Sequence, residues 1–521
     1  MQLRRVVLLV LVVLFVMMYW GTGSRLLGSP QPQHSGGAES MGGGHLGQVH
    51  FPTSCVPAVQ PQFEKGVALL HSFQYTAADQ EFKAVVAADP SCAIAYWGQA
   101  MTLWHELWEH PDAASLKTGH DELQKAAGAK TPRERAYIAA ANAFFADDPQ
   151  LDYKARAAAY SDAMAKVYRD YPEDGDAAAF YALSLIAIPA EGDADLANRK
   201  HAIAILDKLF AAQPDHPGAA HYLIHACDTP QLASEGLDAA RRYAKIAPDS
   251  SHALHMPSHI FARLGLWQEM IDSNLAAETA AAEATKTGLG DAHYQTHAMN
   301  FLQYAYLQTG QNEKAFQLID ALKDVPGISA AETVDEQAIF RARHALETHD
   351  WKMAAQLEST STWPVTWWAR AIGAARTGDA AGAEAAVAKL DQATSATRSK
   401  DASGSNAFMK NQQGYGGGND EKTPNQLEAE AWLDYAQGKQ NEAVQTMRAA
   451  ADREDHDGVD SISMPAREML GDLLMEEKQP QAALEAYRIV LKESPNRLNS
   501  RQGATLAAQL ASTQTVAGGS K

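Results

Sequence analysis

The sequence is poor in basic residues. It contains 44 lysines and arginines against 63 aspartates and glutamates, which gives a formal net charge of −19. A nucleic-acid-binding surface needs a basic patch that neutralises phosphates and releases counterions. The charge balance therefore argues against a nucleic-acid partner.

Several motifs with known chemistry are also missing. The run Gly416-Gly417-Gly418 lacks the Lys-Ser/Thr that completes a phosphate-binding loop. The segment around His105 and Glu106 approaches the zinc-protease helix motif, but His110 falls one residue beyond the required position. The chain has no glycine-flanked nucleophilic serine, no paired-cysteine metal site and no lipobox cysteine. These absences exclude nucleotide binding by such a loop and the zinc-protease arrangement.

Residues 1–20 have the pattern of an export signal. Arg4 and Arg5 precede an unbroken apolar run over residues 6–20. The run is short for a membrane-spanning helix, which favours cleavage, whereas Tyr19 and Trp20 are typical of an interfacial anchor. We expect an inner-membrane signal anchor with an extracytoplasmic, periplasmic body, or a secreted protein if a signal peptide is cleaved.

Composition divides the rest of the chain. Residues 21–50 contain glycine-rich and polar pieces that bury too little apolar surface to fold, so they predict a flexible linker. Residues 395–426 predict a disordered insertion for the same reason. The repeats described next are expected over 51–394 and 427–500, followed by a C-terminal tail over 501–521.

A repeated pattern of small, large and proline residues is the strongest signal in the sequence. Alanine, the best helix former, is abundant throughout. Gly66, Ala78, Phe82 and Pro90 have the offsets of a tetratricopeptide (TPR) repeat: small residues where helices cross, a large one between them, and a closing proline. The same offsets recur near the other end, at Leu470, Gly471, Leu474, Ala483, Tyr487 and Pro495. The pattern predicts an all-α, right-handed α-solenoid of tetratricopeptide-type helix pairs.

Two of the three cysteines lie at matching ends of neighbouring helices. Cys55 precedes the first helix A of the array, and Cys92 starts the next helix A. Neighbouring A helices run roughly parallel, so these ends should be close enough to bridge. We predict a Cys55–Cys92 disulfide, with two separate thiols as the alternative, and a buried thiol at Cys227.

Histidines cluster in the middle of the chain. Eight of the 19 fall between His216 and His297, where an even spread would put about three. His221 and His225 are spaced i, i+4, and His255 and His259 repeat that pair one 34-residue repeat later. The cluster also includes His252 at i−3 from His255, Asp228 at i+7 from His221, and a third i, i+4 pair, His293 and His297.

Imidazoles one helical turn apart can share a transition-metal ion. We expect His221, His225, His255 and His259 to be ligands, lining the concave groove of the solenoid. As further ligands or groups that orient an imidazole we expect His297, His105 and Asp228. Pro257 should kink the helix between the second pair. The alternative is that the pairs were duplicated with the repeat for packing alone, and His71, His201, His344 and His349 are interpreted as ordinary core or surface histidines.

Five blocks of the sequence resemble a bacterial family of exported tetratricopeptide-repeat proteins. They are FPTSC (51–55), DPSCAIAYWGQAM (89–101), HPGAAHYLIHACD (216–228), HALHMPSHIFARLG (252–265) and PAREMLGDLL (465–474). The resemblance covers nearly the whole chain after residue 50. It implies an α-solenoid body in the envelope or outside the cell, and no established activity comes with it. The chain departs from the family pattern after His105, where Pro-Leu-Trp is more usual than Glu-Leu-Trp, which weakens any role for Glu106.

Two functions of different classes follow. The first is an envelope protein that binds zinc or copper through these histidines and, if catalytic, activates water or dioxygen at an open coordination position. The second is a non-catalytic scaffold whose groove binds a peptide or a partner protein, with the histidines as polar contacts. Removing metal with a chelator distinguishes the two functions. A scaffold should still bind its partner, whereas a metal site should lose its ion and its local stability.

Overall fold

The structure is a computed structural model that describes residues 45–107, 110–190, 192–401, 421–458 and 460–518. The apolar run over 6–20 and most of the predicted linker lie outside these residues. Within them, no helix is both long enough and apolar enough to cross a membrane.

The body is built from α-helices and a few short 3-10 helices (η), and the residues described contain no strand. The helices up to the histidine cluster are η1 (Pro57–Val59), α2 (Gln60–His71), α3 (Tyr75–Ala88), α4 (Ala93–Met101), α5 (Ala113–Lys125), η2 (Ala126–Gly128), α6 (Pro132–Phe144), α7 (Tyr153–Asp170), α8 (Gly175–Ala187) and α9 (Gly192–Ala212). The histidine cluster and the C-terminal repeats occupy α10 (Pro217–Cys227), α11 (Leu237–Ile246), α12 (Ser251–His255), α13 (Pro257–Leu264), α14 (Trp267–Lys286), α15 (Ala292–Gln308), α16 (Asn312–Ala321), η3 (Leu322–Asp324), α17 (Ala330–Glu347), α18 (Trp351–Ala355), α19 (Val365–Arg376), α20 (Ala380–Asp401), α22 (Pro424–Ala436), α23 (Gln440–Asp457), α24 (Ala466–Glu476), α25 (Pro480–Glu493) and α26 (Leu498–Gly518).

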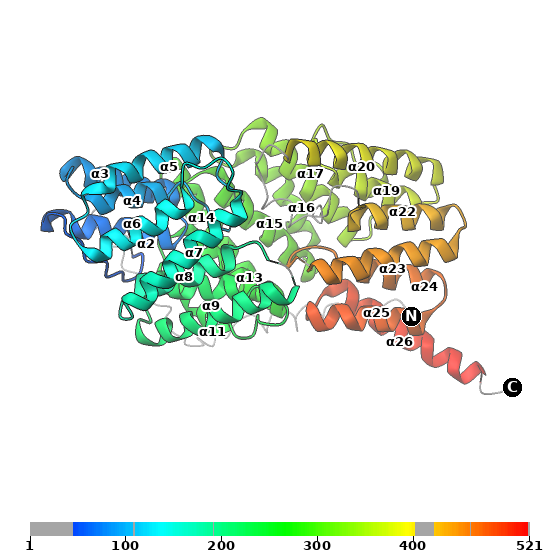
Figure 1. The fold of residues 1–521 in the computed structure, drawn as a ribbon. Helices are drawn as coiled ribbons and strands as arrows, with labels where there is room; N and C mark the ends of the chain where they lie inside the picture. Colours follow the sequence, from blue (N-terminus) through cyan, green and yellow to red (C-terminus); the bar gives the residue numbers. More distant parts are fainter. Residues whose placement is uncertain (1–44, 108–109, 191, 402–420, 459, 519–521) are drawn as a thin grey trace, which may run out of the picture. The chain divides into compact units, whose positions relative to one another are not determined.

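Consecutive helices pack against one another as hairpins, and each hairpin stacks on the next along the chain (Figure 1). This arrangement confirms the predicted all-α solenoid. Each helix pair leaves an apolar face that its neighbours cover. The buried apolar side chains of the described residues form two clusters, one mostly over the helices up to α16 and the other over the helices from α15 to α26.

The two complete sequence repeats pack in the same way. The Phe82 ring of α3 lies against Gly66 in α2 and Gly98 in α4, so closely that a Cβ on either glycine would come within 2.7 Å of it. At the other end, the Tyr487 ring of α25 occupies the corresponding position between Gly471 and Gly503. A glycine on each side of a buried ring lets two successive A helices close on one B helix. The offsets in the sequence therefore describe real contacts.

The turn from helix A to helix B uses one left-handed residue. In four repeats it is a glycine with φ between 64 and 82°, namely Gly265, Gly310, Gly378 and Gly438. In three others a side chain occupies the position: Phe73 (φ 53°), His349 (φ 54°) and Lys478 (φ 56°). A bulky residue in this region is strained by about 1–3 kcal/mol. We therefore expect contacts of the Phe73 side chain to compensate for the strain of its backbone.

The predicted disulfide is present. Cys55 and Cys92 are bonded, with their Cα atoms 4.8 Å apart. Nearby, Asp89 accepts a hydrogen bond from the Val56 backbone N–H at 2.9 Å. The bridge joins the segment before α2 to the start of α4, as expected for A helices whose first turns lie side by side. Cys227 is the buried free thiol.

Helices extend beyond several boundaries expected from composition. Helix α20 runs to Asp401 and α22 begins at Pro424, behind a capping box formed by Thr423 and Gln426. Only residues 402–420 of the expected insertion lie outside the described part. Residues 501–518, expected as a tail, belong to α26. Its first turns pack on α25 because Gly503 allows the close approach to Tyr487.

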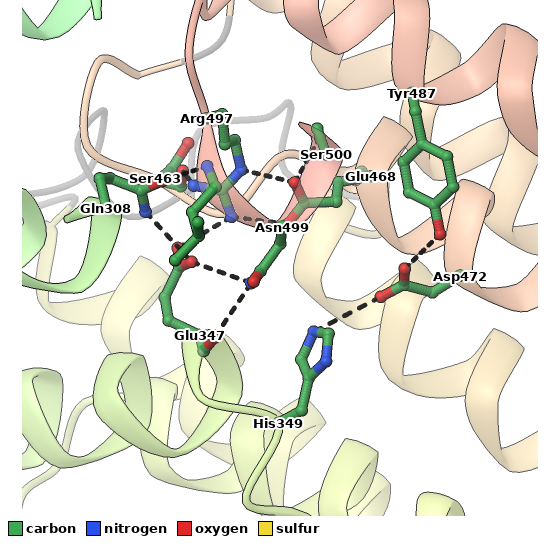
Figure 2. A network of polar contacts seen from close by, with 12 residues as sticks. Gln308, Glu347, His349, Ser463, Glu468, Asp472, Tyr487, Arg497, Asn499 and Ser500 are labelled. Carbon is green, nitrogen blue, oxygen red and sulfur yellow. Dashed lines mark hydrogen bonds and ion pairs between the residues drawn. The ribbon is translucent and has the colours of Figure 1, made fainter. Parts of the chain in front are cut away.

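A buried ionic network ties α26 to the repeats before it (Figure 2). The Arg497 guanidinium bonds Glu468 at 2.7 and 2.8 Å and Glu347 at 2.9 Å, and all three side chains are buried. Arg497 also donates to the Tyr304 hydroxyl at 2.8 Å. Since Arg497 neutralises carboxylates from α17 and α24, one side chain joins three helices of the C-terminal repeats.

Candidate metal centre

Six histidines from four helix segments meet in the interior. Helix α10 carries His221 and His225, α12 carries His252 and His255, α13 carries His259, and α15 carries His297. Local signals position these helices: His216 and Ser250 cap α10 and α12 by accepting hydrogen bonds from the backbones of Ala219 and Ala253. The ligand atoms form two separate groups, each with its nitrogens within 4.8 Å of one another.

The first trio consists of His221, His225 and His252. The Nε2 atom of His221 lies 3.0 Å from Nε2 of His252 and 3.1 Å from Nε2 of His225. Two imidazole nitrogens on one tetrahedral ion at about 2.0 Å are about 3.3 Å apart. Both distances from His221 are thus within a few tenths of an ångström of the spacing that a bound transition metal requires.

The second trio consists of His255, His259 and His297. The Nε2 atoms of His255 and His259 are 3.1 Å apart, and the His297 ring centroid is 4.4 Å from that of His255. Each trio thus combines a pair one turn apart with one histidine from a following helix segment.

Hydrogen bonds to the far nitrogens fix the tautomers. His221 donates from Nδ1 to the His71 carbonyl at 2.6 Å, and His259 donates from Nδ1 to Asp228 at 2.9 Å. His255 donates from Nδ1 to the Asn274 side-chain oxygen at 2.7 Å, because the Asn274 amide nitrogen is itself committed to the Met270 carbonyl. In each neutral ring the remaining Nε2 carries a lone pair. These lone pairs face the interior of the trios.

Burial favours the neutral form of five of these imidazoles. It lowers the pKa of His221 to about 3. It also holds the pKa values of His225, His252, His255 and His297 well below the ordinary value, with the neighbouring imidazoles adding to the effect. At neutral pH these rings are therefore unprotonated, which is the form that binds a metal.

The predicted kink at Pro257 is present as a break between α12 and α13, and it lies inside the second trio, between His255 and His259. Pro257 has no backbone N–H, so the helical ladder breaks between α12 and α13, and the His259 N–H bonds the Met256 carbonyl instead. One helix thus supplies His252 to the first trio, and both His255 and His259 to the second.

The site is enclosed, in contrast to the expected open groove. His221, His252 and His255 are at most 2% exposed, and His225 and His297 are half-buried. The turn after α2 covers the first trio: the Phe73 ring centroid is 4.4 Å from that of His221 and 5.5 Å from that of His225. Tyr294 donates to the Phe73 carbonyl at 2.6 Å. The array therefore closes on itself at this point, and α2 contacts α10.

The second trio has an equivalent wall. The Phe301 ring centroid lies 4.8, 4.6 and 5.2 Å from those of His255, His259 and His297. Each trio is thus bounded on one side by a phenylalanine ring, which excludes water from that side.

The structure separates ligand candidates from supporting residues. Asp228 belongs to neither group: its carboxylate accepts from His259 Nδ1 and, at 2.8 Å, from Arg263, so it orients an imidazole. His105 also lies outside the trios, stacked on Tyr75 at 4.2 Å. The other four expected ligands and His297 lie in the trios. His252 completes the first trio although it is not among the expected ligands, and its i−3 spacing from His255 is the sequence signal that points to it.

A third buried group, formed by His71, Asp176 and His216, is not apparent from the sequence. Asp176 lies 2.9 Å from His71 Nε2 and 3.4 Å from His216 Nε2, and His71 Nδ1 is 3.0 Å from the Tyr222 hydroxyl. The hydrogen bond from His71 and the nearby His216 ring hold the pKa of Asp176 low in spite of its burial. Because α2, α8 and α10 supply these side chains from distant parts of the sequence, no local pattern could have found them. The group supports the backbone carbonyl of His71, which bonds His221.

Glu106 is a buried acid near the first trio. Tyr75 donates to its carboxylate at 3.1 Å, and burial raises the pKa of Glu106 to about 8. The Tyr75 ring in turn stacks on Phe73 at 5.5 Å. A carboxylic acid that keeps its proton at neutral pH thus lies behind the aromatic wall of the site.

No protein-family model and no curated protein matches the sequence. Solved structures do match over most of its length. The human IFIT1 dimer with PPP-AAAA is 13% identical over 85% of this chain and 94% of that chain, with a TM-score of 0.37. Yeast Tom70 is 11% identical over 88% and 96%, with a TM-score of 0.34, and the P58(IPK) TPR domain is 15% identical over 88% and 99%, with a TM-score of 0.21. Identities and TM-scores this low say nothing about what this chain binds.

Proposed function

We propose that the protein binds transition-metal ions in its two histidine trios. One observation carries the proposal: the Nε2 atoms of His255 and His259 are 3.1 Å apart although hydrogen bonds hold the protons of both rings on Nδ1. Two lone pairs at this distance repel each other, and a cation between them, a metal ion or a shared proton, removes the repulsion. The Nε2 atom of His221 likewise has two imidazole nitrogens within 3.1 Å.

Zinc and copper are the expected metals. All six donors are imidazoles, which suit zinc and copper and do not suit magnesium or calcium. Three protein ligands leave the fourth position of a tetrahedral ion open, which is typical of catalytic rather than structural sites. A bound ion would there activate water or dioxygen, so the proposal includes metal-dependent catalysis, and this chain's part is to hold the imidazoles together in the protein interior.

The peptide-scaffold alternative uses the same histidines differently. A peptide contact needs side chains that reach solvent, whereas four of the six imidazoles are at most 7% exposed. Burial thus favours an internal site over a contact surface. A peptide or protein partner elsewhere on the solenoid stays a prediction and is compatible with a metal inside.

An extracytoplasmic location is part of the proposal. The disulfide between Cys55 and Cys92 supports it, since such bonds persist in oxidising compartments. Fusing a reporter that is active only outside the cytoplasm to the C-terminus tests the location, and an inactive reporter would contradict it.

The metal is tested by elemental analysis of the full chain, purified without a metal-binding tag. We expect stoichiometric zinc or copper in the wild-type protein. His221→Gln and His255→Gln should each lose part of it, and the double variant nearly all, because each change removes one ligand from a different trio.

His344→Gln is the matched control, since His344 is buried in α17 away from both trios. It should retain the full metal content. A wild-type protein that stays metal-free after reconstitution, with unfolding unchanged by a chelator, would leave the internal histidines as packing groups.

A further inference from the structure

The two trios are in contact with each other. Ring centroids are 6.2 Å apart between His225 and His259 and 6.1 Å apart between His252 and His255, and each of these distances crosses from one trio to the other. Within the trios the corresponding distances run from 4.4 to 6.3 Å. The six rings thus form one continuous cluster with two separate sets of converging nitrogens. This arrangement suits two ions side by side.

The donor set contains no anion. Neither trio includes a carboxylate or a thiolate, and the nearest acid, Asp228, is already bonded to His259 and Arg263. Cys227, the free thiol on the same helix as His221 and His225, belongs to neither trio. Two divalent ions would bring four positive charges into a buried, uncharged site, whereas two copper(I) ions bring only two. Imidazole also binds copper well.

The surroundings suit a small apolar ligand. Phe73 bounds the first trio and Phe301 the second, whereas His225 and His297, one from each trio, are the half-buried members. Phe73 holds its place in spite of a left-handed φ of 53°, where four other repeats have glycine. The ring of Phe73 thus stays against the first trio although its backbone is left-handed.

We propose that the two trios hold a pair of copper ions that binds one dioxygen molecule between them. The inference rests on the proposed metal binding and deepens it by naming the metal and the ligand. On binding, each copper(I) loses one electron and becomes copper(II). Dioxygen gains both electrons and becomes peroxide between the ions, with no O–O cleavage and no proton required. Removing dioxygen from the solution reverses the step.

The test uses the full-length chain, stripped of metal and loaded with copper(I) under argon. We expect two copper ions per chain, as in other two-metal sites. Titration with dioxygen should then consume one molecule per two coppers and produce a charge-transfer absorption. It should leave no copper(II) signal in electron paramagnetic resonance, because a shared bridge couples the two unpaired spins. Flushing with argon should restore the colourless copper(I) form.

The single-trio variant His255→Gln provides the internal comparison. It should keep about half of the copper, bind no dioxygen reversibly, and give an ordinary copper(II) signal once oxidised, because one ion remains without a partner. His344→Gln should behave as the wild type does. Circular dichroism confirms that each variant is folded.

Two outcomes are distinguishable failures. Two coppers that give uncoupled copper(II) signals and no reversible uptake would overturn the dioxygen proposal and leave metal binding intact. A wild-type chain that retains no copper and no zinc would overturn both proposals.

Discussion

At the scale of single residues, the site depends on groups that never touch a metal. The His71 carbonyl, the Asn274 amide and the Asp228 carboxylate each hold one imidazole proton on Nδ1. Such partners determine which nitrogen is available and how the ring is oriented. They come from three different helices or turns, so the geometry of the trios is over-determined.

Asp228→Asn tests one of these partners. The amide lacks the charge that holds the His259 proton, and its NH2 group can point at the ring, so we expect a 10- to 100-fold loss of metal affinity. Arg263 also loses its carboxylate, so the metal-free protein should be less stable. Competition with a chelator measures the affinity, and Asp238→Asn, on an exposed carboxylate of α11, is the control. Unchanged affinity would mean that Asp228 serves only Arg263.

Glu106→Gln tests a buried acid through pH. The pKa of Glu106 is about 8 in the folded chain, against about 4.5 unfolded, so the native state binds the extra proton between these values. Its stability contribution is therefore full below about pH 4.5 and falls by about 1.4 kcal/mol per pH unit as pH rises towards 8. In Glu106→Gln the free energy of unfolding, measured with urea, should therefore fall less between pH 4.5 and pH 8 than it does in the wild type. Parallel curves for wild type and variant would show that Glu106 is ionised in the folded chain.

At the scale of elements, the helix A to helix B turn repeats a left-handed residue that need not be glycine. Phe73, His349 and Lys478 occupy it with side chains that have contacts of their own. The helix pair is thus a fixed backbone pattern, and a repeat can replace its glycine where a contact compensates for the strain.

Phe73→Ala and Phe73→Gly separate the ring from the backbone. Both variants lose the aromatic wall and should be less stable by about 3–5 kcal/mol. The glycine variant should be the more stable of the two by about 1 kcal/mol, because φ is left-handed there. Gly310→Ala is the matched control, since its Cβ would meet nothing within 4 Å, and it should lose about 1 kcal/mol from the backbone alone. An alanine variant as stable as the glycine one would contradict a strained turn.

Pro257→Ala tests the kink. Alanine restores a backbone N–H that can continue the helix towards the Ala253 carbonyl, which would straighten α12 into α13. His259 should then shift away from His255, so metal in the second trio should bind more weakly while helix content stays the same. Elemental analysis with circular dichroism checks both. Full metal content would mean that packing on α14 and α15 sets the kink.

At the scale of the whole array, buried charge joins distant repeats. Arg497 is fully buried and bonds carboxylates of α17 and α24. Such a network makes a protein little more stable than apolar side chains of similar volume would in its place. Removing a single member is nevertheless costly, because it leaves an unpaired charge in the interior. Figure 2 shows polar side chains of several helices around the Arg497 guanidinium.

Arg497→Met should destabilise the chain by about 3–5 kcal/mol, since Glu347 and Glu468 lose their cation. The triple variant with Glu347→Gln and Glu468→Gln should recover much of this loss. Arg241→Met, which removes an exposed ion pair with Glu269, should have an effect below about 1 kcal/mol. Thermal unfolding of the four proteins measures the differences, and a triple variant no better than the single one would contradict the charge explanation.

Local pattern was enough to predict much of this protein. The offsets from Gly66 to Phe82 and from Gly471 to Tyr487 predicted the helix pairs because small and large residues must alternate where helices cross. The i, i+4 spacing predicted the histidine pairs, since residues one turn apart share a helix face. The disulfide and the kink at Pro257 followed from similar local rules.

Only the tertiary structure decided how these parts combine. Each histidine pair takes its third partner from a later helix, which made His252 a member of the first trio and left Asp228 and His105 outside both. The turn at Phe73 closes over α10 across about 150 residues of sequence, and so the expected open groove is an enclosed site. The sequence of each helix determines which residues lie on its apolar and polar faces. Which of these faces meet depends on how the repeats stack, because the small rotation from each repeat to the next adds up over the whole array.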